Sequence, residues 1–596
     1  MPVKAKISVP QIALALLVGS LFLLPHLVRM AEICSVADYT PFSAQSPSSM
    51  TWDETFLYGP EANFMLRRHA LASDTDTWEH RNEPFPYSVL PTSFEAGLAA
   101  GVGSLKRAQI LCSFIFPTIT AWLLIGVFRQ SGANAPTSAA LALLAVAVEF
   151  STRTVPINLF DLLCHGLHGG AIHTMQASRN PNPNMSFPLF LGAILCLSSA
   201  IQRKSTPGLK IVGVLGGLQF YTYTYYAIGW TAAVVLICIF ALFRPLTVPR
   251  KVVFTLAATA ALAAPFFWWS HLSKLYGEYQ NRASRLGMVF GHSPSKDGIL
   301  LTIVWGAAAL VVWAGWNWIS RRLDSNAVSR TNVTLLVLLF CVLGGLAGMN
   351  MQLVTGFNVQ ETHHFPHMIL QPLVVIMFCI VAAAYWVKMS PRLGVVGFAA
   401  LYLVCAAAQI EGAASTASVH RMLESDKSLF AWLNANSEIG AVVATTDLRL
   451  ATILPLYTHN GTLMANGSCT SASNDELIER YLLANRLIQA PASIVRTELS
   501  QEIEAGSPLP LVTYSEFLFE TAPQKDPTHR KLTPEATQQA LQEYQYIDPA
   551  TELQHLRVDY VWISSGTHPE VPGYEWHNVF ENAEGSLWQI MKKSSN

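Results

Sequence analysis

Residues 333–349 read Val-Thr-Leu-Leu-Val-Leu-Leu-Phe-Cys-Val-Leu-Gly-Gly-Leu-Ala-Gly-Met, a run without a single charged side chain. A helix needs about 20 predominantly apolar residues to cross the hydrocarbon core of a bilayer, so this run and its flanks predict a transmembrane helix. Arg321, Arg322 and Arg330 lie in the short joint before it. Because Lys and Arg favour short cytoplasmic loops, the helix is predicted to begin on the cytoplasmic side.

Further apolar runs of this kind extend over the first two thirds of the chain. They are Ile7–Val28, Ile110–Phe128, Ser138–Phe150, Phe187–Ala200, Ile211–Tyr225, Ala227–Phe243, Val252–Trp269, Ile299–Ile319, Met368–Val387 and Leu393–Ala408. The chain of 596 residues is 51% hydrophobic and 13% charged, which is about half the charged share of an ordinary soluble domain. The pattern predicts an α-helical polytopic membrane protein with about eleven transmembrane helices.

Basic residues fix the predicted orientation of these helices. If the N-terminus is cytoplasmic, every cytoplasmic joint is short and basic. These joints carry Lys4 and Lys6, Arg129, Arg203 with Lys204 and Lys210, Arg244 with Arg250 and Lys251, Arg321 with Arg322 and Arg330, and Lys388 with Arg392. The long polar segments then lie outside, at about residues 30–107, 151–186, 270–298, 350–367 and 409–596. A bacterial inner membrane suits this layout.

The C-terminal third has a different composition. Helical spacing is expected at 428–434, 448–457, 476–488 and 534–546, and strand-like runs at 441–446, 558–563 and 587–591. Alternating helices and strands are typical of an α/β domain. The sequence therefore predicts a transmembrane domain at residues 1–417 with a large first outer loop (about 30–107), and an extracytoplasmic α/β domain at 418–596.

Several function classes are disfavoured by what the sequence lacks. The net charge of −1 gives no basic field for nucleic acid. There is no phosphate-binding P-loop, no glycine-rich dinucleotide turn, no His-Glu-x-x-His and no Gly-x-Ser-x-Gly motif. Ionisable residues are nearly missing from the apolar runs, which disfavours a proton-coupled transporter.

Two adjacent carboxylates mark the first outer segment, within Met50-Thr51-Trp52-Asp53-Glu54-Thr55-Phe56-Leu57-Tyr58. Asp53 or Glu54 could accept a proton from a hydroxyl group, or the pair could hold a divalent metal such as Mg or Mn. A solvated acidic turn, or a helix capped by Asp53, explains the same residues. The same segment continues through other polar residues, including Asp74 and Asp76, which are expected at a solvated surface.

Basic and aromatic residues in later outer segments are candidates for anion and sugar recognition. Arg179 precedes an Asn-Pro-Asn-Pro turn, Arg282 and Arg285 share a helix face, and His363 and His364 lie at the mouth of an apolar run. Alternatively, Arg282 and Arg285 pair with Glu278 or lipid head groups, and the histidines are satisfied by backbone and head groups. Three further histidines, His165, His168 and His173, lack the partners of a zinc set. The aromatic run at 220–226 is interpreted as an interfacial belt, although it could also pack against a sugar.

This layout resembles the GT-C class of membrane glycosyltransferases over nearly the whole chain. The resemblance rests on Trp52-Asp53-Glu54 in a long first outer loop, the short basic inner joints, the outer Arg and His residues named above, and the final stretches Asp559-Tyr560-Val561-Trp562, Val579-Phe580-Glu581-Asn582 and Leu587-Trp588-Gln589-Ile590. In protein O-mannosyltransferases and the lipid A aminoarabinose transferase the carboxylate follows soon after the first helix, whereas here more than twenty residues intervene.

The resemblance implies transfer of a sugar from a polyprenyl-phosphate or diphosphate donor to an unidentified hydroxyl acceptor on the outer membrane face. It implies Asp53 or Glu54 as general base, and Arg179, Arg282, Arg285, His363 and His364 as groups around the donor phosphate. A divalent metal on Asp53 and Glu54 is the variant for diphosphate donors. A transporter or flippase of a lipid-linked substrate, and a non-catalytic membrane scaffold, are the competing hypotheses.

Overall fold

The computed structural model of the chain describes residues 9–33, 38–45, 54–68, 74–83, 89–147, 180–243, 250–275, 283, 285, 288–294, 296–322, 325–359, 364–385, 390–500, 514, 518, 534–564 and 568–593.

Contacts between residues divide the chain into two compact units, each built from three stretches of sequence. Unit 1 comprises Met1–Arg29, Gln109–Phe267 and Val289–Thr416, and unit 2 comprises Met30–Ala108, Trp268–Met288 and Ala417–Asn596. Unit 2 thus combines the C-terminal region with the predicted first outer loop and part of a later one. The domain boundary expected between residues 417 and 418 stays a prediction.

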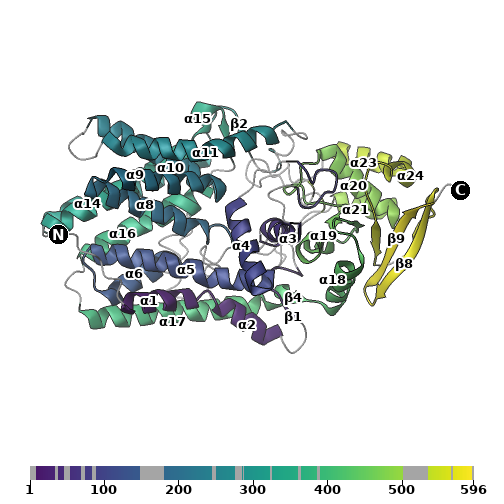
Figure 1. Ribbon diagram of the computed structural model, residues 1–596, viewed down its shortest axis with the longest axis horizontal. Helices are drawn as coiled ribbons and strands as arrows, with labels where there is room; N and C mark the ends of the chain where they lie inside the picture. Colours follow the sequence, from purple (N-terminus) through teal and green to yellow (C-terminus); the bar gives the residue numbers. More distant parts are fainter. Residues whose placement is uncertain are drawn as a thin grey trace. The chain divides into compact units, whose positions relative to one another are not determined.

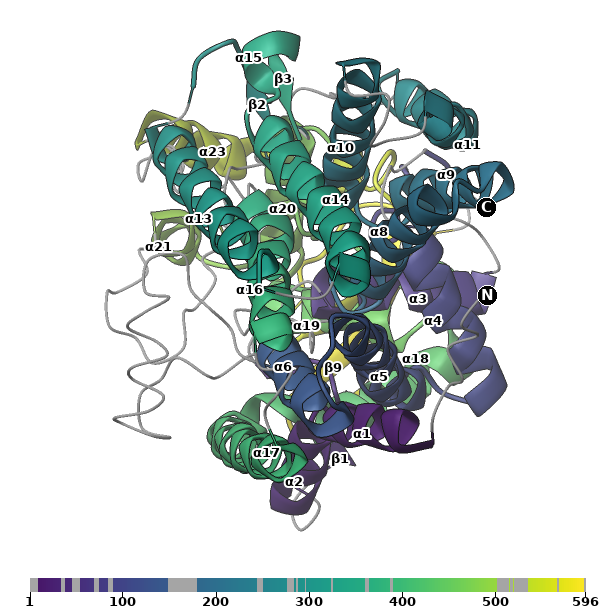
Figure 2. The same ribbon diagram turned by 90° about the vertical axis from the view of Figure 1, so that its left-hand side faces the viewer.

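Unit 1 consists almost entirely of helices, several of which are seen nearly end-on in Figure 2. Its helices are α1 (Val9–Ser20), α2 (Leu24–Ile33), α5 (Leu105–Gln130), α6 (Ala135–Ala147), α8 (Ser186–Arg203), α9 (Thr206–Leu218), η5 (Gln219–Tyr221), α10 (Thr224–Phe243), η6 (Arg250–Val252), α11 (Val253–Ser273), α13 (Lys296–Ser320), α14 (Ser325–Met349), α15 (Gln352–Thr355), η7 (Pro366–Leu370), α16 (Gln371–Tyr385) and α17 (Pro391–Ser415). Two short strands, β2 (Val289–Phe290) and β3 (Phe357–Asn358), pair antiparallel.

Eight helical segments among the described residues are long and apolar enough to cross a membrane. They are Val9–Ile33, Leu105–Gln130, Thr224–Phe243, Val253–Leu272, Gly298–Ser320, Thr331–Met349, Pro366–Tyr385 and Pro391–Ser415. Each coincides with a predicted span, so the chain is a multi-pass membrane protein.

Three of the eleven predicted spans do not form such helices. The runs at 138–150, 187–200 and 211–225 fall on α6, α8 and α9, which are shorter or less uniformly apolar. The run at 211–225 ends early because the chain turns through η5 after Leu218, and Tyr225 already belongs to α10. A continuous apolar sequence therefore concealed a helix break, and the count of eleven is not confirmed.

Glycines permit the close approach of α10 and α14. A Cβ atom on Gly344 of α14 would lie 2.3 Å from the carbonyl oxygen of Gly229 and 2.7 Å from the backbone nitrogen of Ala233, both on α10. Membrane helices associate through such small residues, because van der Waals contact replaces the hydrophobic driving force that is absent in lipid. The Gly-Gly pair in the 333–349 run therefore serves packing.

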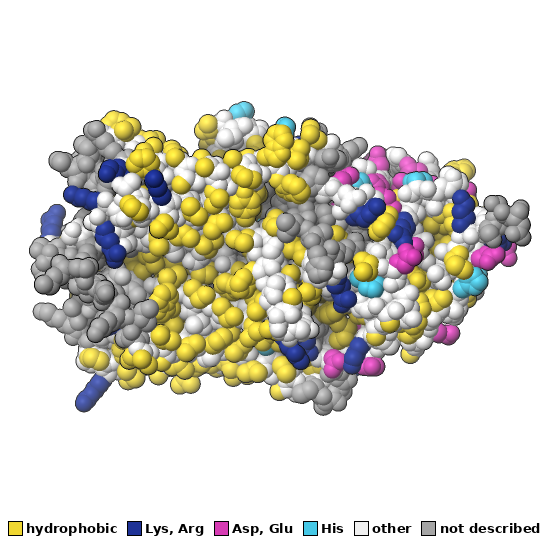
Figure 3. Space-filling model, viewed as in Figure 1, with side chains coloured by type: hydrophobic (Ala, Val, Ile, Leu, Met, Phe, Trp, Pro, Cys, Tyr) yellow, Lys and Arg dark blue, Asp and Glu magenta, His cyan; other side chains and the backbone are white. Residues whose placement is uncertain are grey.

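The outward surface of several unit 1 helices is hydrophobic. Large apolar side chains stay exposed along α13, including Ile303 at 62%, Leu310 at 61% and Val311 at 71%. Figure 3 shows hydrophobic side chains covering the helices of this unit on the face in view. Exposed apolar patches of this extent are expected where a helix faces lipid.

The aromatic run at 220–226 is not an exposed interfacial belt. Phe220, Tyr223, Tyr225 and Tyr226 are each less than 9% exposed within unit 1. Tyr226 stacks on Phe190 of α8 with ring centroids 4.7 Å apart. The belt interpretation was wrong for these four residues, because helix packing in unit 1 covers their rings.

Unit 2 mixes helices with a five-stranded sheet (Figure 1). Its elements are β1 (Asp38–Tyr39), η1 (Glu54–Tyr58), α3 (Gly59–Arg68), α4 (Val89–Val102), η9 (Ala417–His420), β4 (Arg421–Met422), α18 (Glu424–Asn436), β5 (Val442–Ala444), α19 (Leu448–Tyr457), β6 (Gly461–Thr462), α20 (Asn474–Leu487), α21 (Ala492–Ser500), α23 (Pro534–Tyr546), α24 (Pro549–Glu552), β7 (Tyr560–Ile563), β8 (Tyr574–Asn582) and β9 (Gly585–Lys592).

The sheet has the strand order β6-β5-β7-β9-β8. β5 pairs parallel with both β6 and β7, whereas β9 pairs antiparallel with β7 and β8. The helices predicted at 448–457 and 534–546 are confirmed as α19 and α23, and the predicted strands coincide with β5, β7 and β9.

β5 lies at a topological switch in this sheet, since its two parallel neighbours are on opposite sides. In α/β sheets, sites form beyond the carboxyl ends of the strands at such a point. The loop that follows β6, residues 463–473 (the β6–α20 loop), leaves the sheet at this edge, and nearly all of its residues are buried.

Candidate functional site

Three of the seven predicted site residues lie in the described part of the chain. Glu54 and Arg285 belong to unit 2, and His364 belongs to unit 1. Asp53, Arg179, Arg282 and His363 lie outside the described residues.

Glu54 is the first residue of the π-helical turn η1, which continues directly into α3. Its residue is only 3% exposed, so the interpretation of this carboxylate as part of a solvated turn was wrong. Gly59 makes the junction possible: a Cβ atom there would lie 2.4 Å from the Glu54 carbonyl oxygen and 2.6 Å from Cδ1 of Leu456. π-Helical turns occur often at functional sites, where they redirect side chains.

Further buried carboxyl groups follow Glu54 in unit 2. We call Glu61, Asp74 and Asp76 the acidic cluster; they are 3%, 0% and 5% exposed. Burial raises the pKa of Glu61 to about 8. A hydrogen bond with the Thr92 hydroxyl opposes this rise, and the charge of Asp76 adds to it. Burial and the charge of Asp74 likewise raise the pKa of Asp76 to about 8. Both groups are therefore largely protonated at neutral pH and can donate or accept a proton.

The sequence did not reveal this cluster. Asp74 and Asp76 were expected at a solvated surface, which is wrong, and Glu61 was not singled out. Spacing along the chain gave no signal, because the burial arises from distant segments: α3, which carries Glu61, packs against α4 and α19, and Asp74 and Asp76 contact the β6–α20 loop and β6.

Asp74 connects residues 74–77 to the β6–α20 loop through hydrogen bonds. Its carboxylate accepts hydrogen bonds from the backbone N–H groups of Asp76 (3.1 Å) and Thr77 (2.9 Å), and from the Thr77 hydroxyl (2.7 Å). It also accepts from the Thr470 hydroxyl at 2.6 Å and from the backbone N–H of Ser471 at 2.9 Å. A carboxylate with five donors is held rigidly, so Asp74 acts as a structural clamp.

Arg285 holds the other side of the β6–α20 loop. It is 2% exposed. Its Nε donates to the Gly467 carbonyl (2.6 Å), Nη1 to Oδ1 of Asn474 (2.7 Å), and Nη2 to the carbonyls of Thr470 (3.2 Å) and Ala472 (2.7 Å). The planar guanidinium group makes these four hydrogen bonds at once, which the ammonium group of Lys could not do. Its role at a donor phosphate stays a prediction.

We expect Arg285→Gln to lower the free energy of unfolding of the solubilised protein by about 2–4 kcal/mol, because several hydrogen bonds to a charged group are lost inside the fold. Arg285→Lys should lose most of the same stability despite keeping the charge. Thermal unfolding in detergent measures both variants. Arg496→Gln is the control, since Arg496 is exposed on α21; equal stability of Arg285→Gln and this control would contradict the anchoring role.

A network of paired charges lies beside the acidic cluster in unit 2. Arg480, 1% exposed, forms ion pairs with Glu79 (2.5 Å) and Glu476 (2.6 Å). His80 bridges Glu83 and Glu476, each at 2.8 Å. Burial alone would lower the pKa of His80, but its hydrogen bonds to Glu476 and Glu83 raise that pKa to about 10. Burial opposes ionisation of Glu476, yet His80 and Arg480 hold its pKa at about 2.

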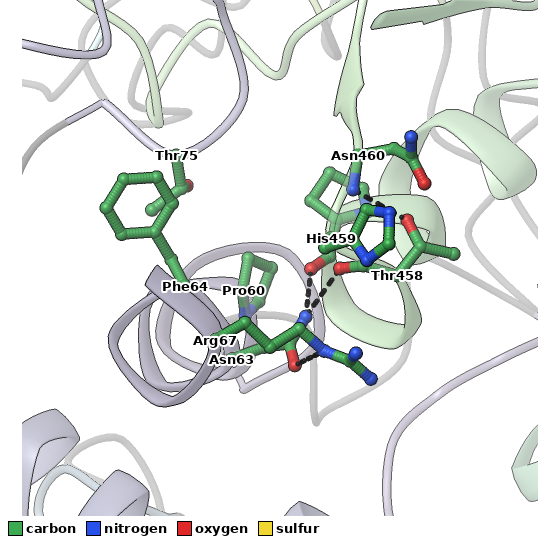
Figure 4. A pocket seen from close by; sticks show the side chains of 9 residues that line it. Pro60, Asn63, Phe64, Arg67, Thr75, Thr458, His459 and Asn460 are labelled. Atoms are coloured by element: carbon green, nitrogen blue, oxygen red, sulfur yellow. Dashed lines mark hydrogen bonds between the residues drawn. The ribbon is translucent and has the colours of Figure 1, made fainter. Parts of the chain in front are cut away.

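A small pocket with a volume of about 10 Å³ lies between α3 and the turn after α19 (Figure 4). Asn63 spans it by donating to the carbonyls of Pro455 (2.8 Å) and Thr458 (2.7 Å). Arg67 donates from Nε to Oδ1 of Asn63 at 2.9 Å, and its terminal nitrogens extend past that bond in Figure 4. The pocket is also lined by His459, and its volume is enough for about one water molecule.

In unit 1, His364 stacks on Tyr225 with ring centroids 4.8 Å apart and an angle of 7° between the planes. The asparagines that follow Arg179 are also fixed: Asn180, Asn182 and Asn184 are buried. Their side-chain amides donate to the carbonyls of Gln109 (3.2 Å), Thr222 (3.3 Å) and Cys112 (3.2 Å), respectively. The Asn-Pro-Asn-Pro turn is therefore packed into unit 1.

Metal-ligating side chains converge at another place. Among the described residues, the group whose ligand atoms lie within 4.8 Å of one another is Glu479, Glu552 and His555, and it does not include Glu54. The predicted metal site on Asp53 and Glu54 stays a prediction, since Asp53 lies outside the described residues.

Comparison with known proteins gives little direct identification. No protein-family model matches the chain, and no curated protein matches it. Among solved structures, the crystal structure of the Archaeoglobus fulgidus oligosaccharyltransferase in complex with Zn and sulfate is similar, with 9% identity and a TM-score of 0.41. The match covers 91% of this chain and 68% of that one. A TM-score at this level does not establish a common fold.

Proposed function

We propose that this chain is a glycosyltransferase of the GT-C type that moves a sugar from a polyprenyl-phosphate donor to a hydroxyl acceptor on the outer membrane face. The observation that carries the proposal is the burial of Glu54 at the start of the η1–α3 helical segment in a multi-pass membrane protein. The resemblance in sequence layout supports the same function. A carboxylate in such a position can act as a general base without competition from bulk water.

In the proposed reaction, Asp53 or Glu54 accepts the proton of the acceptor hydroxyl. The hydroxyl oxygen forms a bond to the anomeric carbon through an oxocarbenium-like state, while the bond from that carbon to the phosphate oxygen breaks. The phosphate leaves with the bonding electron pair. A single displacement of this kind inverts the anomeric configuration.

The developing charge on the phosphate needs preorganised donors. Arg179, Arg282, Arg285, His363 and His364 are the proposed groups. Where the donor is a diphosphate, Mg or Mn on Asp53 and Glu54 would neutralise part of its charge. Nothing in this scheme requires a nucleotide.

We propose that the acidic cluster takes up the released proton. Glu61 lies two helical turns beyond Glu54 on the same η1–α3 segment, about 10 Å along the axis. With pKa values of about 8, Glu61 and Asp76 exchange protons near neutral pH. We propose that they reset the base after each transfer.

Membranes that contain the chain test this proposal when they are incubated with a polyprenyl-phosphate-linked radiolabelled hexose. The expected result is label on a non-donor product, in amounts that depend on the chain, as resolved by chromatography. Label that crosses proteoliposomes still attached to its polyprenyl carrier would instead establish a flippase. Absence of both activities over chain-free membranes would favour the scaffold.

A further inference from the structure

Glu479, Glu552 and His555 bring three metal-ligating atoms together in unit 2. Nε2 of His555 lies 2.6 Å from Oε1 of Glu479 and 2.9 Å from Oε2 of Glu552. All three ligand atoms lie within 4.8 Å of one another. Glu479 comes from α20, whereas Glu552 and His555 come from α24 and the turn that follows it.

The local sequence presents Glu552 and His555 together on one face. Asp548 caps α24 by accepting from the backbone N–H of Ala550, and Pro549 occupies the first helical turn. Glu552 and His555 are three residues apart and therefore neighbours on a helical surface. Leu556 is buried in a hydrophobic core of unit 2, and Leu553 packs against that core. These contacts give the turn a defined position relative to α20.

One ligand atom of the trio makes no hydrogen bond with the described residues. Oε2 of Glu552 is buried and lies 2.9 Å from Nε2 of His555, but accepts no hydrogen bond of proper geometry from them. Both carboxylates form ion pairs with the same imidazole, that of His555. A cation bound between the three side chains would compensate the charges of both carboxylates.

The imidazole is oriented as a ligand. The Thr551 carbonyl interacts with the His555 ring, while Nε2 faces the two carboxylates. Metal-bound histidines almost always have their second nitrogen fixed by a carbonyl or carboxylate in this way. An imidazole with two carboxylates suits zinc, whereas Mg and Ca prefer all-oxygen sets.

We propose that Glu479, Glu552 and His555 form a zinc site with water as the fourth ligand. Ligand atoms of a tetrahedral zinc lie about 3.3 Å apart, so Nε2 of His555 would move away from Oε1 of Glu479 by about 0.7 Å and from Oε2 of Glu552 by about 0.4 Å on binding. The ion ties the turn after α24 to α20.

The site would act structurally on the neighbouring charge network. Arg557, two residues beyond His555, donates its backbone N–H to Oε1 of Glu79 at 2.8 Å. Glu79 pairs with Arg480 on α20, one residue after Glu479. A metal ion bound between α20 and the turn after α24 would therefore fix the positions of Arg480 and Arg557, which both contact Glu79.

Zinc binding to the purified full-length chain tests the proposal. After chelator treatment and desalting in detergent, zinc is titrated in competition with a chromogenic chelator. One equivalent is expected to bind with an affinity that Glu479→Gln, Glu552→Gln and His555→Ala each lower by at least about tenfold. Zinc should also raise the thermal midpoint of the wild-type protein and not that of the variants.

A similar pair elsewhere in unit 2 provides the control. His577 and Glu575 lie 3.7 Å apart on β8 and are both about half exposed, and they belong to no three-residue set among the described residues. His577→Ala should bind zinc as the wild type does. Equal zinc affinity in wild type and His555→Ala, or no stoichiometric binding by a wild-type protein that elutes as a single species, would overturn the proposal.

Discussion

The double variant Asp53→Asn, Glu54→Gln is expected to lower the rate of sugar transfer by about 10²- to 10⁴-fold, the usual contribution of a general base. Both substitutions keep the size of the side chain and remove its basicity. Glu54 is already buried, so a neutral amide introduces no new buried charge. The protein should therefore still accumulate in the membrane and show an unchanged thermal midpoint.

Separate single variants assign the base between the two positions. The residue that accepts the proton should carry nearly the whole loss, and the rate of the impaired variant should not recover between pH 6 and pH 9. Glu438→Gln is the matched control, because Glu438 lies in the same unit with its side chain 87% exposed. Full transfer activity in the double variant would remove Asp53 and Glu54 from the catalytic site.

Arg480→Met is expected to lower the free energy of unfolding by about 3–5 kcal/mol, the usual effect of breaking a buried ion pair from one side. Arg480 is almost fully buried and pairs with Glu79 and Glu476 at once. Met fills similar volume but leaves two carboxylates without their cation. Among the described residues, His80 still pairs with Glu476 and the backbone N–H of Arg557 still donates to Glu79.

The pH dependence of this effect has a definite sign. Glu476 has a native pKa of about 2, below its ordinary value of 4.5, so its stabilising contribution is fully present above pH 4.5 and is lost as pH falls toward 2. The stability difference between wild type and Arg480→Met should therefore be largest near neutral pH and shrink in acid. Adding Glu79→Gln and Glu476→Gln to Arg480→Met should recover part of the loss. A difference no larger than that of the exposed control Arg496→Met would contradict the role of Arg480.

Local patterns in the sequence determined the membrane character and most of the secondary structure. Apolar runs such as 333–349 must form helices in lipid, because only a helix satisfies every backbone group within one segment. For the same kind of reason, helical spacing placed α19 and α23 at their observed bounds. These predictions succeed because each depends on residues within one element.

Only the tertiary structure decided which polar residues form a site. Asp74 meets Thr470 and Ser471 across nearly 400 residues of sequence, and Arg285 meets Gly467 across 182. No periodicity encodes such distances. The burial that raises the pKa values of Glu61 and Asp76 likewise arises from packing between distant segments. The sequence alone thus determined where this chain meets lipid, and long-range packing determined which of its carboxylates are withdrawn from water.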